Sequence, residues 1–121
     1  MRLTFKRYDS FTAELAKMQQ PPTVILLYNP TAYEIYRDVL VDRDREMDRV
    51  SEFLKRALSD YAAKNRWMFV DLTASLTDEV TRSGAWIFGN HDTKDWSPQG
   101  TRIVAPVLAR ELSKVLGPLG R

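Results

Sequence analysis

The clearest hydrophobic pattern in the chain is a pair of short runs that are apolar on both faces. Residues 23–28 and 67–72 are almost entirely apolar, as strands buried between helices are. Residues 2–7 instead alternate apolar with polar or charged side chains, which predicts a short edge strand. A further apolar run, residues 85–88, leads into the polar stretch 90–95. The pattern therefore predicts two central strands, with a polar loop late in the chain.

Apolar residues at helical spacing predict four longer helices around these strands. They cover residues 10–18, 44–64, 73–81 and the segment that starts at 97. Ser10 and Ser97 are expected to cap the first and the last of these helices, with Pro98 at the first helical position of the last. A shorter helix is expected directly after Asn29, with Asn29 as its cap.

The order of strand, helix, strand, helix, loop and helix predicts an α/β domain. We expect a mostly parallel sheet of three or four strands flanked by helices, which is part of a flavodoxin-like three-layer sandwich. The 121 residues are expected to form a single domain, 1–121, in which the tail 117–121 is frayed.

Composition narrows the classes of function. The chain has 18 basic and 16 acidic residues and no basic block, so we expect no nucleic-acid partner. It has no cysteine, which excludes disulfides, thiolate metal ligands and cysteine nucleophiles. The N-terminus is too polar for a signal peptide and no apolar run reaches membrane-spanning length. We therefore expect no membrane association, a cytoplasmic location by default, and no cofactor.

Candidate binding residues lie where the predicted strands end. In parallel sheets, functional groups gather at the carboxyl ends of the strands, because those ends meet at one edge. That edge should carry polar and aromatic side chains from three separate segments. The candidate ligand-binding residues are Tyr28, Asn29, Asp71, Asn90 and Trp96. An alternative role for Asp71 is to cap the helix that follows it.

Candidate catalytic residues are concentrated in the late polar loop. His91, the only histidine, precedes Asp92, and the pair fits a general base with its orienting carboxylate. A surface histidine beside a capping aspartate fits better, because adjacent side chains seldom face each other. Together with Asp95 the pair could also bind a cation, but without a glycine-rich loop we predict no metal site. Ser10 is a candidate nucleophile, although a helix cap explains it better.

Three segments of the chain resemble the second half of an SGNH (GDSL-type) hydrolase domain, of the branch with polysaccharide O-acetyltransferases. They are residues 22–30 with 34–36, residues 69–73, and residues 92–105. The last segment is the most specific. It resembles the family's final catalytic block, which has an Asp, two residues, a His and then Trp-Ser/Asn-Pro-x-Gly before a helix. The resemblance implies the family's α/β sandwich, and it covers roughly residues 20–116.

The resemblance also shows what this chain lacks. It places the catalytic aspartate at Asp92 and the catalytic histidine at Asp95, which is unable to act as that base. No Gly-Asp-Ser block is present, and the Asp-Ser pair that contains Ser10 has no buried strand before it. We therefore expect a truncated or degenerate SGNH-like domain without serine esterase activity of its own. The alternatives are an esterase or acetyltransferase rebuilt on Ser10 and His91, or a module that binds a carbohydrate, an acyl ester or a protein.

An assembly expectation follows from the same resemblance. In the complete family fold, the strand that matches residues 23–28 lies inside the sheet, whereas here only residues 2–7 precede it as a possible partner strand. An open edge on a strand that is apolar on both faces recruits other strands. We therefore expect a homodimer that uses this edge or the adjacent helices, unless residues 2–7 fold back to cover it.

Overall fold

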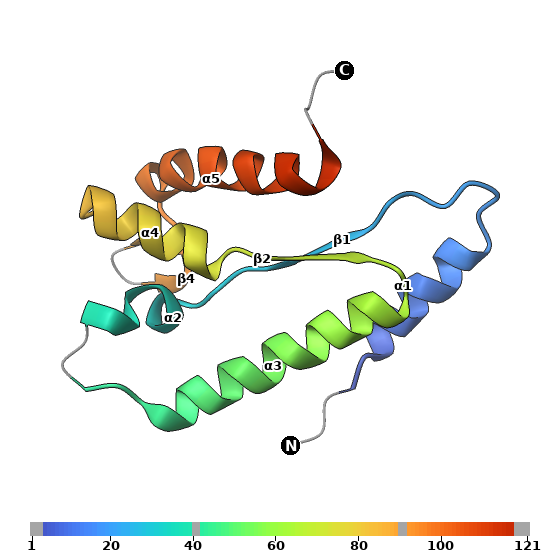
Figure 1. Ribbon diagram of the computed structural model, residues 1–121, viewed down its shortest axis with the longest axis horizontal. Helices are drawn as coiled ribbons and strands as arrows, with labels where there is room; N and C mark the ends of the chain where they lie inside the picture. Colours follow the sequence, from blue (N-terminus) through green and yellow to red (C-terminus); the bar gives the residue numbers. More distant parts are fainter. Residues whose placement is uncertain (1–3, 40–41, 90–91, 118–121) are drawn as a thin grey trace.

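The computed structural model describes residues 4–39, 42–89 and 92–117. These residues form an α/β domain in which a parallel pair of strands lies between helices on both sides (Figure 1). Helix α3 packs on one side of the pair, and α4 and α5 lie on the other. The elements of this sandwich are β1 (Ile25–Tyr28), α3 (Arg45–Lys64), β2 (Met68–Asp71), α4 (Thr73–Ser83) and α5 (Pro98–Leu116).

Strands β1 and β2 run parallel and end in the same register. Ile25 is opposite Met68 at one end of the pair, and Tyr28 is opposite Asp71 at the other. The backbone N–H of Leu72 donates to the carbonyl of Tyr28 at 3.1 Å, which extends the ladder by one bond. The prediction that the two apolar runs form strands is confirmed, and so is the prediction that their carboxyl ends meet.

A second, antiparallel pair follows α4. Strand β3 (Phe88–Gly89) pairs with β4 (Asp92–Trp96), and Phe88 lies opposite Trp96. The prediction of a loop over 92–95 was therefore wrong. The strand was missed because β4 consists mostly of polar residues, which show no alternating apolar pattern. The described residues contain one parallel and one antiparallel pair, and the expected mostly parallel sheet of three or four strands is not seen among them.

The N-terminal segment forms a helix and not a strand. The predicted edge strand over 2–7 was wrong for its described part, because α1 (Lys6–Ala16) already begins at Lys6. Aromatic side chains on α1 hold it against the end of α3. Phe5, just before α1, stacks on Tyr61 with ring centroids 4.5 Å apart, and Phe11 meets the edge of Trp67 at 5.9 Å.

Two of the predicted helix caps were misplaced. Ser10 lies inside α1 and its hydroxyl donates to the carbonyl of Lys6 at 3.0 Å, so it is not a cap. Helix α2 (Ala32–Tyr36) is capped by Thr31 in place of Asn29, and the 3₁₀ turn η1 (Arg37–Val39) continues it. The other boundaries agree closely with the sequence. Ser97 caps α5 with Pro98 at its first position, as predicted. Asp44 caps α3, which the sequence analysis had not predicted.

The hydrophobic core lies on the α4 and α5 side of the parallel pair. Its buried side chains are Ile35, Val70, Leu72, Leu76, Val80, Ile87, Phe88, Val104 and Val107. On the same face of the pair, Leu27 and Met68 remain 38% and 37% exposed, so the helices cover this face only in part. Of the tail predicted to fray, residues 118–121 lie outside the described part of the chain, and Gly117 follows the end of α5.

Candidate functional site

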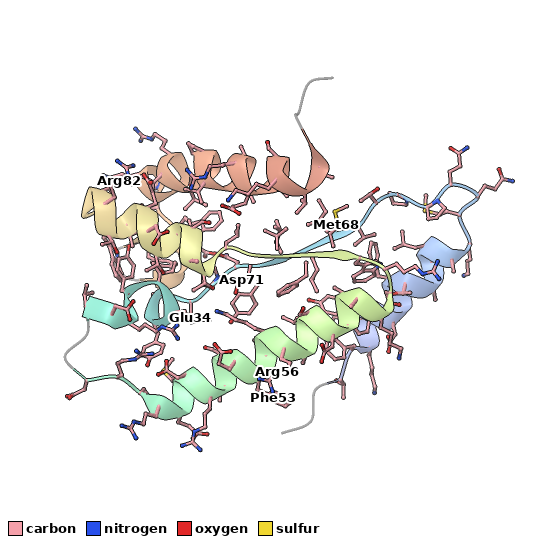
Figure 2. All side chains as sticks on the ribbon, viewed as in Figure 1. Glu34, Phe53, Arg56, Met68, Asp71 and Arg82 are labelled. Carbon is pink, nitrogen blue, oxygen red and sulfur yellow. The ribbon has the colours of Figure 1, made fainter. Side chains whose placement is uncertain are left out.

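Four polar side chains meet at the carboxyl ends of β1 and β2. Tyr28 and Asp71 are the last residues of the two strands, Glu34 comes from α2, and Lys55 comes from the middle of α3. Figure 2 shows Glu34 and Asp71 close together where the strands end, above α3. These four residues, Tyr28, Glu34, Lys55 and Asp71, are called the strand-end cluster.

The local sequence explains why Glu34 points into the cluster. Glu34 is the third residue of α2, and its carboxylate folds back on the cap residue Thr31. The Thr31 N–H and hydroxyl both donate to Glu34 Oε1, at 3.0 and 3.1 Å. In return, the Glu34 N–H donates to the Thr31 hydroxyl at 3.2 Å, which completes a capping box. The start of α2 therefore holds the Glu34 carboxylate in place, and Glu34 is only 1% exposed.

Lys55 forms an ion pair with each of the two carboxylates of the cluster. Its Nζ lies 3.6 Å from Glu34 Oε2 and 3.3 Å from Asp71 Oδ2, and its side chain is only 15% exposed. The ammonium also lies 5.2 Å from the centroid of the Tyr28 ring, within the range of a cation–π contact. The second oxygen of Asp71 accepts from the N–H and the hydroxyl of Thr73, at 2.9 and 2.6 Å. Asp71 thus also stabilises the start of α4, the alternative role that the sequence suggested.

Tyr28 serves the cluster as a hydrogen-bond donor. Its hydroxyl donates to Glu34 at 2.9 Å from each carboxylate oxygen. Burial raises the pKa of the Tyr28 phenol, and the hydrogen bond to Glu34 and the negative charges of Glu34 and Asp71 raise it further. A phenol with a raised pKa stays protonated, so Tyr28 is unsuited to act as a base or nucleophile. The carboxylates of the cluster are therefore occupied by other members or by the N–H and hydroxyl groups of Thr31 and Thr73.

A small pocket opens beside the cluster, between α3 and the start of α2. Its volume is about 240 Å³, which is below the usual range for drug-sized ligands. The polar part of its wall comes from Tyr28, Thr31, Glu34, Asp44, Glu46 and Ser51. Its apolar part consists of Met47, Val50 and Leu54. The pocket is therefore a narrow opening beside the cluster, and Trp96 does not line it.

The structure brings together only part of the predicted site. Tyr28 and Asp71 meet through Lys55, while Asn29 is exposed beside them. Trp96 is half-buried and packs against the hydrophobic core, and its Nε1 has no hydrogen-bond partner within the described residues. The tryptophan predicted to contact a ligand thus contributes to packing.

The predicted catalytic residues are distributed over two distant elements or lie outside the described part. Asn90 and His91 are outside the described residues. Asp92 opens β4, and Asp95 is an exposed residue of the same strand. Ser10 is exposed on α1, which lies at the opposite end of the molecule from β4 (Figure 1). The structure therefore keeps Ser10 apart from the strand that carries Asp92 and Asp95.

Sequence reasoning missed Glu34 and Lys55, and both had a signal. The Thr31 to Glu34 spacing is that of a capping box, which predicts a carboxylate folded onto its own helix start. Lys55 follows Ser51 by four residues and precedes Leu58 by three. Those are positions on one face of a helix. A lysine on the packed face requires an anionic partner, which the cluster provides.

The start of α5 is built on the backbone of Ile87. The Ser97 N–H donates to the Ile87 carbonyl at 2.9 Å, and the Ser97 hydroxyl oxygen accepts from the Gly100 N–H at 2.9 Å. Gly100 is buried against Ile87, where a Cβ atom would overlap the carbonyl oxygen and lie 2.6 Å from the carbonyl carbon. The Trp-Ser-Pro-x-Gly sequence is therefore explained here by a helix start that packs tightly on Ile87, the residue directly before β3.

We expect Ser97→Ala to lower the free energy of unfolding by about 1 kcal/mol, because the Gly100 N–H loses its acceptor. Urea titration followed by circular dichroism would measure the loss. Ser113→Ala is the matched control on the same helix, since the Ser113 hydroxyl only donates to the carbonyl of Ala109 inside the helix. An equal loss in both variants would show that the Ser97 cap contributes nothing specific.

Within the residues that the structure describes, no helix is long and apolar enough to cross a membrane. In the same residues, no group of three or more His, Asp or Glu side chains is arranged to hold a metal ion. In the strand-end cluster, the Lys55 ammonium supplies the positive charge between the carboxylates. Comparisons with known protein families, characterised proteins and solved structures found no match for this chain.

Proposed function

We propose that this chain is a degenerate SGNH-like domain without serine esterase activity of its own. The observation that carries the proposal is the state of the strand ends. In a catalytic member of the resembled family, this edge of the sheet would carry a nucleophile, a base and oxyanion donors. Here the described residues at that edge form the strand-end cluster, in which Tyr28, Glu34, Lys55 and Asp71 hold one another.

The placement of Ser10 also supports the absence of esterase activity. A nucleophilic serine needs a base within hydrogen-bond reach. The Ser10 hydroxyl donates to the Lys6 carbonyl within α1, which lies far from β4 in Figure 1. Asp95, which stands where the resemblance places the catalytic histidine, is exposed on β4. A rebuilt site that uses Ser10 would require α1 to leave the aromatic contacts that hold it to α3.

The finer fold belongs to the same proposal. Two parallel strands alone are a marginal sheet, and β1 pairs with β2 on one side only among the described residues. The partly exposed Leu27 and Met68 support an incomplete face on this pair. One or two further parallel strands added beside β1 would give the mostly parallel sheet of three or four strands that the sequence led us to expect.

The test is a search for an acyl-enzyme. We expect no burst of p-nitrophenol when the protein is mixed with p-nitrophenyl acetate, and no adduct in intact-mass spectra after treatment with a fluorophosphonate. An active serine esterase would serve as the positive control for both reagents. A stoichiometric burst that disappears in both Ser10→Ala and His91→Ala would instead establish the rebuilt esterase. A fluorophosphonate adduct on any serine would also refute the proposal.

A further inference from the structure

The outer edge of β1 carries backbone groups that have no neighbouring strand. Among the described residues, β1 pairs only with β2. Successive residues of a strand turn their backbone groups to opposite sides, and the carbonyls of Val24 and Tyr28 accept from β2 at 3.0 and 3.1 Å. The N–H and carbonyl groups of Ile25 and Leu27 therefore point away from β2. No other backbone group of the described residues bonds to them.

The sequence of this edge lacks the features that usually keep edge strands apart. Natural edge strands carry charged residues or prolines that prevent pairing with another chain. Residues 23–29 contain neither, and Leu27 in their middle is 38% exposed. The outer edge of β2 differs, because Asp71 is charged and the Trp67 N–H already donates to the Ala62 carbonyl at 2.8 Å. The edge of β1 is therefore the one suited to accept a further strand.

The outward row of backbone groups is symmetric about Leu26. The alternation that sets residues 25 and 27 outward sets residues 23 and 29 outward as well, and residues 21 and 31 would come next. Residue 21 is Pro21, which has no N–H to donate. The N–H of Thr31 already donates to the Glu34 carboxylate at 3.0 Å. The row that can bond another strand therefore covers residues 23–29, and its centre is Leu26.

We propose that a second copy of this chain pairs with this edge, with the two β1 strands antiparallel and a two-fold axis at Leu26. Ile25 of each copy lies opposite the partner's Leu27, and the two residues exchange both of their backbone hydrogen bonds. The exposed Leu27 side chain packs beside the partner's Ile25, which lies against the hydrophobic core of that copy. The two parallel pairs become one sheet of four strands, with both β1 strands in the middle.

The symmetry of the edge favours a second copy over a strand of another protein. A two-fold axis places a residue before Leu26 opposite the residue equally far after it, so every outward residue of 23–29 meets another outward residue. The segment is uncharged, so two copies meet without repulsion. A pair of strands is marginal by itself, and a sheet of four is not. The second copy takes the place beside β1 where a further parallel strand would otherwise pair, and the inference is independent of esterase activity.

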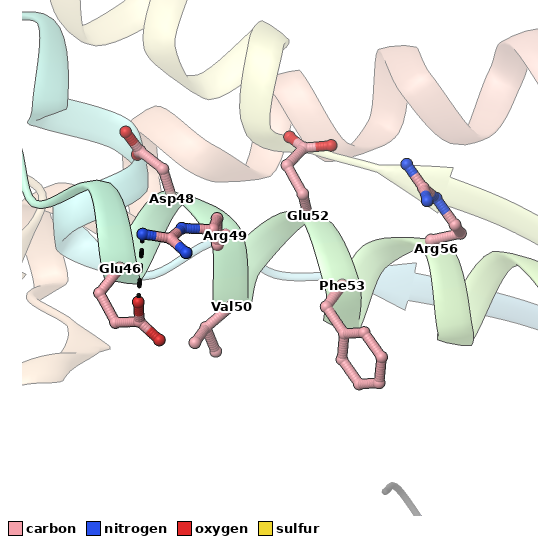
Figure 3. A pocket seen from close by; sticks show the side chains of 7 residues that line it. All are labelled: Glu46, Asp48, Arg49, Val50, Glu52, Phe53 and Arg56. Carbon is pink, nitrogen blue, oxygen red and sulfur yellow. Dashed lines mark ion pairs between the residues drawn. The ribbon is translucent and has the colours of Figure 1, made fainter. Parts of the chain in front are cut away.

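The first test compares two apolar-to-lysine variants by sedimentation velocity over a dilution series. The parent should change from a dimer of two 14.0 kDa chains to a monomer on dilution. Leu27→Lys should raise the dissociation constant about a hundredfold or more, because both copies lose an apolar contact and gain a charge at the pairing edge. Phe53→Lys is the matched control and should dimerise like the parent. Phe53 is 41% exposed, and Figure 3 shows it on α3 pointing away from the strands.

The second test locates the two-fold axis with single cysteines, since the chain has none of its own. Leu26→Cys should form a disulfide between two copies under mild oxidation, because the Cα atoms of such an opposite pair lie about 4.5 Å apart. Val24→Cys is the matched control, two residues earlier on the same side of the strand. Its two copies would be offset by about 13 Å along the strands, too far for a disulfide. Non-reducing gel electrophoresis would show which variant forms the covalent dimer.

Three outcomes would overturn the proposal. A monomer at every concentration up to about 300 μM would leave no dimer to explain, since such weak association is far below that of a stable interface. A dimer that persists in Leu27→Lys would place the contact elsewhere, such as on the outer side of α3. Disulfides in both cysteine variants would indicate parallel strands, and disulfides in neither would refute the axis at Leu26. Circular dichroism of each variant would verify that it is folded, and the cysteine test stands if Leu27→Lys unfolds.

Discussion

Replacing Gly100 by alanine should lower the free energy of unfolding by about 3 kcal/mol or more, although alanine is the better helix former. The added Cβ would overlap the Ile87 carbonyl oxygen, so α5 or β3 must shift. A shift of α5 would also disturb the hydrogen bond that the Gly100 N–H donates to the Ser97 hydroxyl. Chemical denaturation would show the loss, and the melting temperature should fall by about 10 °C or more.

Gln99→Ala is the control for Gly100→Ala. Gln99 is the preceding residue of the same helix turn and is exposed, so its truncation should change the free energy of unfolding by less than about 0.5 kcal/mol. A Gly100→Ala variant as stable as Gln99→Ala would mean that the backbone of α5 has room for a side chain here. The close packing of α5 on Ile87 would then be wrong.

Lys55→Met should cost about 3–5 kcal/mol, because it leaves the Glu34 carboxylate buried without a cation. Methionine keeps the length and most of the apolar stem of lysine, so the loss reports the charge and not a cavity. Glu34 is 1% exposed, and water therefore gives it little compensation. Urea titration of the parent and the variant at the same pH would measure the difference.

Two further variants show whether the stability lost in Lys55→Met comes from the buried charge of Glu34. Lys114→Met removes an ion pair to Glu111 from a lysine that is 62% exposed, and it should cost less than about 1 kcal/mol. Lys55→Met combined with Glu34→Gln removes both charges and should recover about 2 kcal/mol of the Lys55→Met loss. If Lys55→Met were as mild as Lys114→Met, the strand-end cluster would contribute little to stability.

The parts of the fold that the sequence predicted are those with a strong local signal. The two apolar runs gave β1 and β2 because strands buried on both faces lack polar positions. Helix α3 was predicted from its apolar stripe, and its cap Asp44 stands directly before it. Ser97 and Pro98 marked the start of α5 to the residue, because a capping side chain followed by proline is specific to helix starts.

The parts that were missed depend on contacts between distant segments. Strand β4 is polar, and it is held by pairing with β3 and by the packing of Trp96 on the core. Residues 2–7 alternate like a strand, but Phe5 stacks on Tyr61 from another helix, and this contact favours α1. The partners of Lys55 lie on α2 and β2, far away in sequence. No local pattern encodes such partners, so the two carboxylates that Lys55 contacts were not predicted.

The shared end of β1 and β2 sets an order of events for folding. Tyr28 and Asp71 are opposite each other, yet the whole of α2, η1 and α3 lies between them in the chain. The helices form from local contacts, whereas the parallel pair must first close this long loop, and such non-local pairing is slow. Lys55 lies on the crossover helix itself, so its ammonium loses water only when the strands align. We therefore expect the step that joins the two strands to be the step that also buries the charges, so that strand pairing and charge burial occur as one cooperative event.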